Sequence, residues 1–306
     1  MRTLLRAASA VAIFAGIHTG AAHGDALDAD IQATAVDGVV VPGAANGEPV
    51  GLPVNANSVS ADQIGETINA VTTEDALKYM GTIFIRRRHI GDTQAPMTTR
   101  TSGVGSSARS LIYADGVLLS ALIGNNNSTA SPRWGMVAPE DIARVDLRFG
   151  PFSAAFPGNS IGAVVEISTR NPRGFEASGR VDAGWQSFSA YGTKDDYRTL
   201  AGALSVGDRR GPFSWRLGYT HVDSQAQPLT YVTAARAASP SSTGVAAMGA
   251  FSTVNRFGAP IVVIGAGAIE DQRLETARLR LTLDLPGDIT GTFAVGYFGN
   301  RANARA

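Results

Sequence analysis

Apolar and polar residues alternate one by one in the second half of the chain. The pattern is clearest in three runs, at 213–220, 278–285 and 292–297. In the second run every other residue is leucine, and Arg278 and Arg280 stand between the leucines. A period of two predicts β-strands with one apolar and one polar face. Arginine opposite leucine over about ten residues is typical of transmembrane barrel strands, with lipid outside and a wet lumen inside. A soluble antiparallel sheet with one solvated face has the same pattern.

Turn signals divide this half into strands. We expect about five of them, near 176–187, 198–207, 212–223, 274–285 and 288–298. Tight turns are predicted at 208–212 and 286–288, a polar connection at 187–197 and a long connection at 224–272. Outer-membrane barrels show the same alternation, with short turns on the periplasmic side and long loops on the extracellular side.

Three shorter apolar runs lie between 109 and 170. The first, 111–114, ends in Asp115-Gly116, a strong signal for a tight turn. The second, 142–149, alternates apolar and charged residues and stops at Gly150-Pro151. The third, 161–169, is rich in β-branched residues and follows a Pro-Gly-Asn turn. These runs predict a packed β-rich unit.

Two helical signals and one strand precede this unit. Ser60 and Gln63 have the spacing of a capping box. A firmer helix is predicted from Thr73 to Met80, with Thr72 or Thr73 as its cap and Gly81 at its end. The strand predicted at 83–85 follows it.

The order of these motifs resembles the plug domain of TonB-dependent outer-membrane receptors. The matching positions are Asp115-Gly116-Val117, Pro139, Arg144-Val145-Asp146, Arg148, Gly150-Pro151, Ser153-Ala154, Phe156, Gly158, Ile161-Gly162-Ala163-Val164 and Thr169. The sequence departs from the family pattern at Asp146, where the family has Glu, at the additional Phe149 and Pro157, and at Ala163, where it has Gly. The resemblance assigns a structural role in the plug to Asp115, Gly116, Arg144, Arg148, Gly150, Pro151, Gly158 and Gly162.

The resemblance implies a mainly β chain, with an α+β plug domain followed by antiparallel transmembrane β-barrel strands. Residues 1–22 are predicted to be a signal peptide, because charged Arg2 and Arg6 precede an apolar core and Gly20-Ala21-Ala22. A buried core helix is the alternative. Residues 23–59 form a flexible segment, 60–172 the plug, and 173–306 about the first five barrel strands. Because large plugged barrels have about 22 strands, we expect an incomplete barrel, from an N-terminal fragment or a truncated gene product.

The flexible segment contains the residues Asp37, Gly38, Val39, Val40 and Val41. By resemblance this is where the family keeps its TonB box, which pairs as a strand with the energising protein TonB. Strand addition needs only a free backbone and short β-branched side chains. An ordinary strand or linker is the alternative.

Plug loops of the family reach the ligand, and two polar stretches here occupy their positions. The ligand-binding candidates are Asp92, Gln94, Asn125, Asn126, Asn127, Arg133 and Trp134. Asn and Arg can hydrogen-bond a polar or anionic ligand and Trp can stack on it; solvated loops without ligand contact are the alternative. The basic run 86–89 fits an anionic ligand, or arginines paired with acids inside a barrel.

Composition narrows the function classes. A formal net charge of zero argues against a nucleic-acid surface. The chain has no cysteine, which excludes disulfides and thiolate metal sites, and His89 has no metal-ligand partner at a suitable spacing. We find no phosphate-binding loop, nucleophile elbow or catalytic triad. We therefore expect no catalytic residue, metal or cofactor, and no enzyme.

The resemblance implies energy-coupled uptake of a scarce ligand across the outer membrane of a Gram-negative bacterium, after Sec-type export. The expected partners are TonB, a small molecule such as a ferric siderophore, and outer-membrane lipid. The alternative is a non-transporting outer-membrane binding or surface-interaction protein. Deletion of 37–41 distinguishes the two, because only transport needs TonB.

Overall fold

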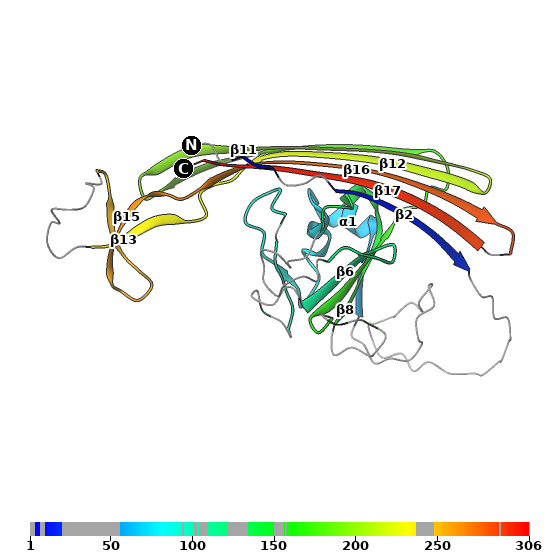
Figure 1. Ribbon diagram of the computed structural model, residues 1–306, viewed down its shortest axis with the longest axis horizontal. Helices are drawn as coiled ribbons and strands as arrows, with labels where there is room; N and C mark the ends of the chain where they lie inside the picture. Colours follow the sequence, from blue (N-terminus) through cyan, green and yellow to red (C-terminus); the bar gives the residue numbers. More distant parts are fainter. Residues whose placement is uncertain are drawn as a thin grey trace.

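A computed structural model shows two parts, a long curved sheet and a smaller domain beneath its concave face (Figure 1). We call the sheet the wall and the smaller domain the plug. The structure describes residues 4–6, 10–19, 56–93, 95–100, 103, 109–120, 134–149, 156, 158, 160–236, 248–287 and 289–305, the first two segments as backbone only.

The wall is built from five long antiparallel strands. In sheet order they are β17 (Ile289–Arg305), β16 (Ile269–Leu285), β12 (Phe213–Gln225), β11 (Thr193–Arg210) and β10 (Glu176–Ala190). The five predicted strands are therefore confirmed, and most are several residues longer than expected. The sheet does not close on itself within the described residues, since β10 has no neighbour there on its outer edge.

The connection predicted at 187–197 is wrong. β10 and β11 instead pair as far as Ala190 and Thr193, and only Tyr191 and Gly192 turn the chain. Both have positive φ, 47° and 79°, as the central residues of a type I′ hairpin turn must. The polar residues on either side belong to strands whose ends extend beyond the plug.

Side chains of the wall alternate between its two faces, as the sequence pattern predicts. Register places Leu217 and Leu279 together on the convex face, and Arg216 and Arg280 together on the concave face. Leu204, Leu217 and Leu283 are 66%, 45% and 41% exposed, whereas Ser214 and Thr282 are buried. The convex face is thus an apolar band, and the polar face points toward the plug.

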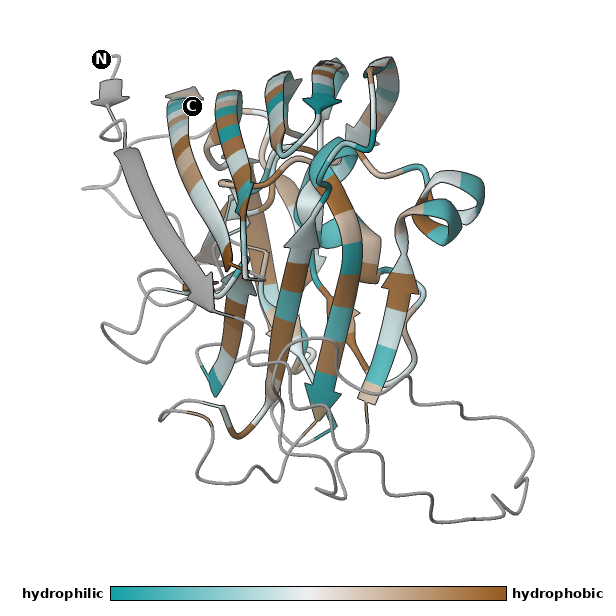
Figure 2. Ribbon diagram, turned by 90° about the vertical axis from the view of Figure 1, so that its right-hand side faces the viewer, coloured by the Kyte–Doolittle hydropathy of each residue, from teal (hydrophilic) through white to brown (hydrophobic). Residues whose placement is uncertain are grey.

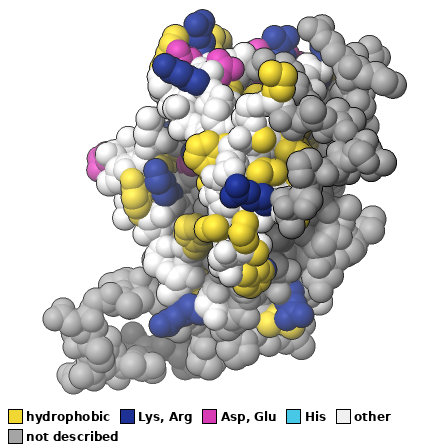
Figure 3. All heavy atoms as spheres, turned by 90° about the vertical axis from the view of Figure 1, so that its left-hand side faces the viewer, with side chains coloured by type: hydrophobic (Ala, Val, Ile, Leu, Met, Phe, Trp, Pro, Cys, Tyr) yellow, Lys and Arg dark blue, Asp and Glu magenta, His cyan; other side chains and the backbone are white. Residues whose placement is uncertain are grey.

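The long connection 224–272 contains a second small sheet, which the sequence pattern did not predict. It consists of β13 (Tyr231–Ala235), β15 (Pro260–Ala266) and β14 (Phe251–Val254). Tyr191 packs edge-on against Tyr231 and Phe251, at centroid distances of 4.9 and 5.5 Å. Hydrophobic and arginine side chains are exposed at this end of the molecule (Figure 3).

Two segments near the N-terminus lie along the remaining edge of β17. They are β1 (Leu4–Arg6) and β2 (Ala10–Thr19), both antiparallel to β17. The predicted leader core therefore has strand conformation in this structure, where a run of apolar and small residues covers a free sheet edge. The signal peptide itself stays a prediction.

The plug contains a mixed five-stranded sheet. Its order is β3 (Ala56–Ser60), β8 (Ile142–Phe149), β9 (Ala163–Thr169), β6 (Ser110–Ala114) and β7 (Val117–Leu118), with β6 and β9 parallel. Apolar and charged residues alternate along β8, whereas β6 and the first half of β9 are almost entirely apolar and buried; bands of both hydropathy classes are visible on strands of this sheet (Figure 2). Ile112, Leu147 and Val165 are fully buried in one core. The packed β-rich unit predicted at 109–170 is therefore present.

Short helices complete the plug. α1 (Ala61–Thr67) has the predicted capping box, in which Gln63 N–H donates to Ser60 Oγ and Ser60 N–H donates to Gln63 Oε1. The helix predicted at 73–80 is only a 3-10 turn, η1 (Thr73–Leu77), because Thr72 and Asp75 form a tight cap and the chain turns at Gly81-Thr82. A short ribbon, β4 (Phe84–Ile85) and β5 (Met97–Thr98), follows. No helix among the described residues is long and apolar enough to cross a membrane.

Candidate functional site

Three acidic residues of the plug face the wall. Asp115 follows β6 in a turn with Gly116, and both have positive φ. Its carboxylate accepts hydrogen bonds from the Thr169 backbone N–H at 2.8 Å and from the Thr169 hydroxyl at 2.7 Å. Glu140 and Asp141 lie in η3 (Pro139–Asp141), a 3-10 turn that begins with proline. The Asp115-Gly116 turn and the 3-10 turn η3 thus hold all three carboxylates at the end of the plug sheet next to the wall.

Four arginines of the wall point toward these acids. Arg216 lies in β12, Arg278 and Arg280 lie in β16, and Arg180 lies in β10. In β12 and β16 every second residue faces the plug, and these arginines occupy plug-facing positions. Because side chains alternate between the two faces of a strand, arginines at every second position bring several guanidinium groups to one side of the sheet.

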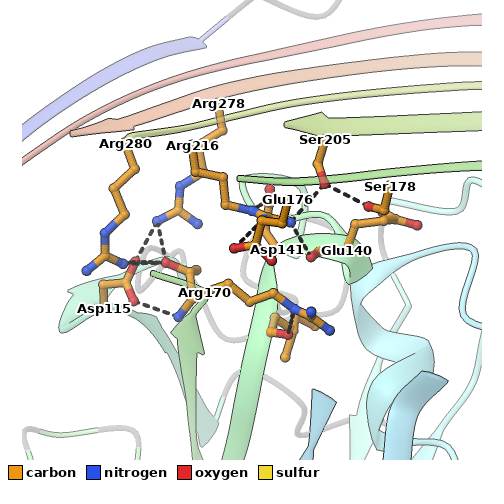
Figure 4. Close-up of polar contacts among 12 residues, drawn as sticks. Asp115, Glu140, Asp141, Arg170, Glu176, Ser178, Ser205, Arg216, Arg278 and Arg280 are labelled. Carbon is orange, nitrogen blue, oxygen red and sulfur yellow. Dashed lines mark hydrogen bonds and ion pairs between the residues drawn. The ribbon is translucent and has the colours of Figure 1, made fainter. Parts of the chain in front are cut away.

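The two sets of charges form ion pairs across the plug–wall interface (Figure 4). Asp115 binds Arg278 at 2.5 Å and Arg280 at 2.9 Å. Asp141 binds Arg216 at 3.0 Å, with both side chains almost fully buried. Glu140 binds Arg180 at 2.9 Å. We call these four pairs the interface ion pairs.

Burial and the arginines act in opposite directions on the plug carboxyl groups. Burial by itself raises the pKa of Asp115, but Arg280, Arg278 and the Thr169 hydrogen bonds outweigh it and hold the pKa below its ordinary value. Burial raises the pKa of Glu140, and Arg180 offsets this only in part. Of these two carboxyl groups, Asp115 is therefore the more firmly ionised.

Glycines let the wall approach the plug closely. A Cβ at Gly218 would lie 3.1 Å from both carboxylate oxygens of Asp141. One at Gly207 would lie 2.6 Å from Pro172, and one at Gly296 would lie 2.6 Å from Met136. A small apolar cluster of Val71, Ala201 and Val222 adds to this contact. The interface is therefore tight, but mostly polar.

Two arginines of the basic run 86–89 are paired with acids, in line with the second of its two interpretations. Arg87 binds Asp75 at 2.8 Å, Arg88 binds Asp92 at 2.7 Å, and His89 lies 3.5 Å from Glu270 of the wall. The hydrogen bond from Arg88 to Asp92 raises the pKa of Arg88 and so stabilises its protonated form.

Glu74, next to this run, is buried in the plug at 3% exposure. Burial raises its pKa to about 7, and the neighbouring Asp75 adds to the effect, while a hydrogen bond from Thr72 and the charge of Arg87 oppose it. Its Oε1 atom has no hydrogen-bond partner among the described residues.

Two of the predicted ligand-binding residues lie inside the plug instead of at its surface. Asp92 is buried and engaged by Arg88 through three hydrogen bonds, and Trp134 is 4% exposed in the plug core. Both pack inside the plug in this structure, and their assignment as ligand-binding residues stays a prediction. The other candidates, Gln94, Asn125, Asn126, Asn127 and Arg133, lie outside the described residues.

The plug-motif residues occupy the sheet and its turns. Arg144 binds Asp146 and Arg148 binds Glu166, each at 2.5 Å. The Gly162 N–H donates to the Arg109 carbonyl at 2.8 Å, which begins the parallel pairing of β6 and β9. Gly158 lies in the turn before β9. Gly150, Pro151 and the TonB-box candidate Asp37–Val41 lie outside the described residues.

Sequence reasoning missed most of the interface ion pairs. Asp115 appeared as a turn residue, and Glu140, Asp141 and Arg216 were not singled out. Arg278 and Arg280 were placed on the lumen face, but their partners lie more than 150 positions earlier in the chain. Two sequence features could have predicted such a pair when taken together: an acidic residue at the end of a plug strand, and an arginine on the lumen face of a barrel strand.

The described residues contain no group of three or more His, Cys, Asp or Glu side chains that could hold a metal ion. The acidic and basic side chains of the interface pair across it, so the geometry supports a docking contact between two parts of one protein.

Comparison with known proteins agrees with this architecture. Residues 48–164 match the family model of the TonB-dependent receptor plug domain. Among solved structures, a mutant of the ferric enterobactin receptor from Pseudomonas aeruginosa in complex with enterobactin has a TM-score of 0.51 at 14% identity, covering 81% of this chain and 34% of that one. A double mutant of the same receptor has a TM-score of 0.52 at 14% identity, covering 80% and 33%.

No curated protein matches the sequence. The chain spans about a third of the length of the solved receptors it resembles. At this identity the likeness concerns the fold, in which a plug lies against a wall of antiparallel strands. Residues 48–164 therefore match the plug domain of TonB-dependent receptors, and the chain shares the fold of the solved receptors over about 80% of its length.

Proposed function

We propose that this protein is a TonB-dependent outer-membrane receptor that takes up a scarce ligand, a ferric siderophore. The observation that carries the proposal is a plug domain docked through charged pairs on the concave face of a sheet whose convex face is apolar. Members of the plug family are outer-membrane proteins of Gram-negative bacteria. The siderophore assignment is supported by the fold shared with the ferric enterobactin receptor.

The convex face suits contact with lipid. Its apolar band on β16 runs from Ala277 to Leu285, and beyond Ala277 the charged residues Glu275 and Arg273 occupy the same face. Nine residues at about 3.4 Å per residue span roughly 30 Å along the strand, enough for the ~25 Å apolar band of outer-membrane barrels, whose strands are tilted. The charged residues at its end then lie at the membrane surface.

The plug–wall interface suits a plug that has to move. Among the described residues its main contacts are ion pairs and hydrogen bonds, which water can replace, and its apolar cluster is small: Val71, Ala201 and Val222, with Ile90 and Leu274 packed against them. Displacing the plug therefore exposes little apolar surface, which at about 25 cal/mol per Å² keeps the hydrophobic cost low. TonB, bound to residues 37–41, supplies the pull in this proposal, and the signal peptide 1–22 directs export.

Uptake and binding measured separately test the proposal. The gene is expressed from its complete reading frame in a Gram-negative host that lacks its own siderophore receptors, in strains with and without TonB. We expect uptake of one iron-55 siderophore from a panel, lost in the strain without TonB and in a variant lacking 37–41, with surface binding kept in both.

The control variant lacks 44–48, a neighbouring stretch of equal length outside the candidate box, and should transport normally. Uptake that persists without TonB would contradict the energy-coupled mechanism. Binding without uptake in every strain would favour the non-transporting receptor instead.

A further inference from the structure

A small, partly open cavity lined mainly by arginine lies between plug and wall. Its walls are Arg170 and Thr169 at the end of the plug sheet, Asp141 of η3, and Arg216, Arg278 and Arg280 of the wall. Figure 4 shows the guanidinium groups of Arg216, Arg278 and Arg280 directed from the wall toward the plug carboxylates. The cavity measures about 10 Å³, the minimum for one water molecule, so a halide ion, which is larger than water, enters only if the arginine side chains around it move slightly apart.

Positive charge exceeds buried negative charge around this cavity. Four guanidinium groups line it, together with a single carboxylate, that of Asp141. Asp115 next to it is shared by Arg278 and Arg280, and Glu176, 3.5 Å from Arg216, is more than a third exposed. Arg170 donates to the Ile142 carbonyl at 3.0 Å and has no ion pair among the described residues.

Two buried donors in this group have no acceptor. Arg278 Nη1 and Arg280 Nε are buried and make no hydrogen bond to any described residue. Buried N–H groups of charged side chains are nearly always paired with an acceptor, because water no longer solvates them. An anion supplies both the missing acceptor and the missing negative charge.

We propose that this cavity binds one monatomic anion, chloride in the cell, which bridges the plug to the wall. The cavity is too small for phosphate or a carboxylate ligand, and a water molecule would leave the charge excess in place. Bound chloride stabilises the docked plug, because the ion is lost when plug and wall separate. The site is independent of the transported ligand.

Replacing chloride at constant ionic strength tests the site. The protein, purified in detergent, is unfolded thermally in sodium gluconate and in mixtures that replace gluconate by chloride or bromide. We expect the midpoint to rise by a few degrees and to saturate as a single site fills, with bromide acting like chloride. Crystals grown in bromide should show an anomalous peak among Arg216, Arg278 and Arg280.

Arg278→Gln and Arg170→Gln should both lose the halide-dependent rise. Arg170→Gln breaks no described ion pair, so it keeps the test valid if Arg278→Gln fails to fold. Arg273→Gln, on the same strand but on the convex face and half exposed, should keep the full rise. Equal midpoints in gluconate and chloride, or a rise retained in both cavity variants, would overturn the proposal. A bromide peak without any change in midpoint would mean an adventitious ion only, and would overturn it as well.

Discussion

Asp115 binds two arginines of the wall, whereas Asp141 and Glu140 in the interface ion pairs bind one each. It accepts hydrogen bonds from one backbone N–H and one hydroxyl, and it binds two guanidinium groups of the wall. Removing it leaves Arg278 and Arg280 largely buried without their counter-charge. Removing one partner of a buried ion pair reduces stability much more than removing one partner of an exposed pair, because the other charge stays buried without compensation.

Asp115→Asn should therefore destabilise the docked plug by about 3 kcal/mol. The matched control is Asp223→Asn, which breaks the exposed pair with Arg273 and should cost less than about 1 kcal/mol. Amide hydrogen exchange in β6 and β9 measures the change, since Asp115 ties the ends of both strands. Equal exchange in the two variants would show that the interface pairs do not hold the plug.

Glu74 gives the plug a pH dependence of its own. Its pKa rises from 4.5 in the unfolded chain to about 7 in the folded protein, so the folded state binds more protons between these values. The contribution to stability is fully present below pH 4.5 and is lost as the pH rises through 7. A shift of this size corresponds to at most about 3 kcal/mol.

The Glu74→Gln variant should lose this pH dependence. Hydrogen exchange of the plug core should slow in the unmodified protein as the pH is lowered from 8 to 5, after correction for the intrinsic rate, and change less in the variant. Glu66→Gln, at an exposed position of α1, serves as the control and should behave like the unmodified protein. An unchanged pH dependence in Glu74→Gln would assign the effect to other groups.

At the scale of elements, the strands were more predictable than their connections. Alternation identified the five wall strands, because one face is apolar and the other polar over their whole length. The Tyr191-Gly192 turn was missed because tyrosine rarely adopts positive φ, and the sheet at 231–266 was missed because its strands are short and half exposed. In the plug sheet β6, β8 and β9 could be placed because glycine or proline turns bound them, whereas β7 was not predicted and β3 lies at the end of the segment 23–59, which was predicted to be flexible and whose last residues, 56–59, are instead part of the sheet.

Close approach of β12 to η3 predicts a specific steric effect. Gly218→Val would place a branched side chain against Asp141 and separate it from Arg216. We expect the plug to become sensitive to trypsin while the wall stays intact. Gly202→Val, on the convex face of β11 with 3.8 Å to its nearest neighbour, should leave the digestion pattern unchanged. A resistant plug in Gly218→Val would mean that the backbone can yield at this contact.

At the scale of the molecule, the sequence predicted both parts but could not predict how they dock. The plug motifs and the wall alternation are local patterns that a chain shows within about ten residues. Docking depends on pairs such as Asp115 with Arg278, which are 163 positions apart, and on glycines whose neighbours become visible only in the folded protein. The same limit applies to Asp92 and Trp134, whose polar and aromatic character resembles that of ligand contacts although both are buried.

The central claim is that the convex face of the wall meets lipid while the concave face holds the plug. The chain has no cysteine, so single cysteines can carry spin labels along β16 and β17 in lipid bilayers. The account predicts high oxygen accessibility at Leu281, Leu283, Phe293 and Val295 on the convex face, and low accessibility at Thr282, Thr292 and Ala294 on the concave face. Uniform accessibility along both strands, or high accessibility of the convex positions to a water-soluble nickel complex, would contradict it.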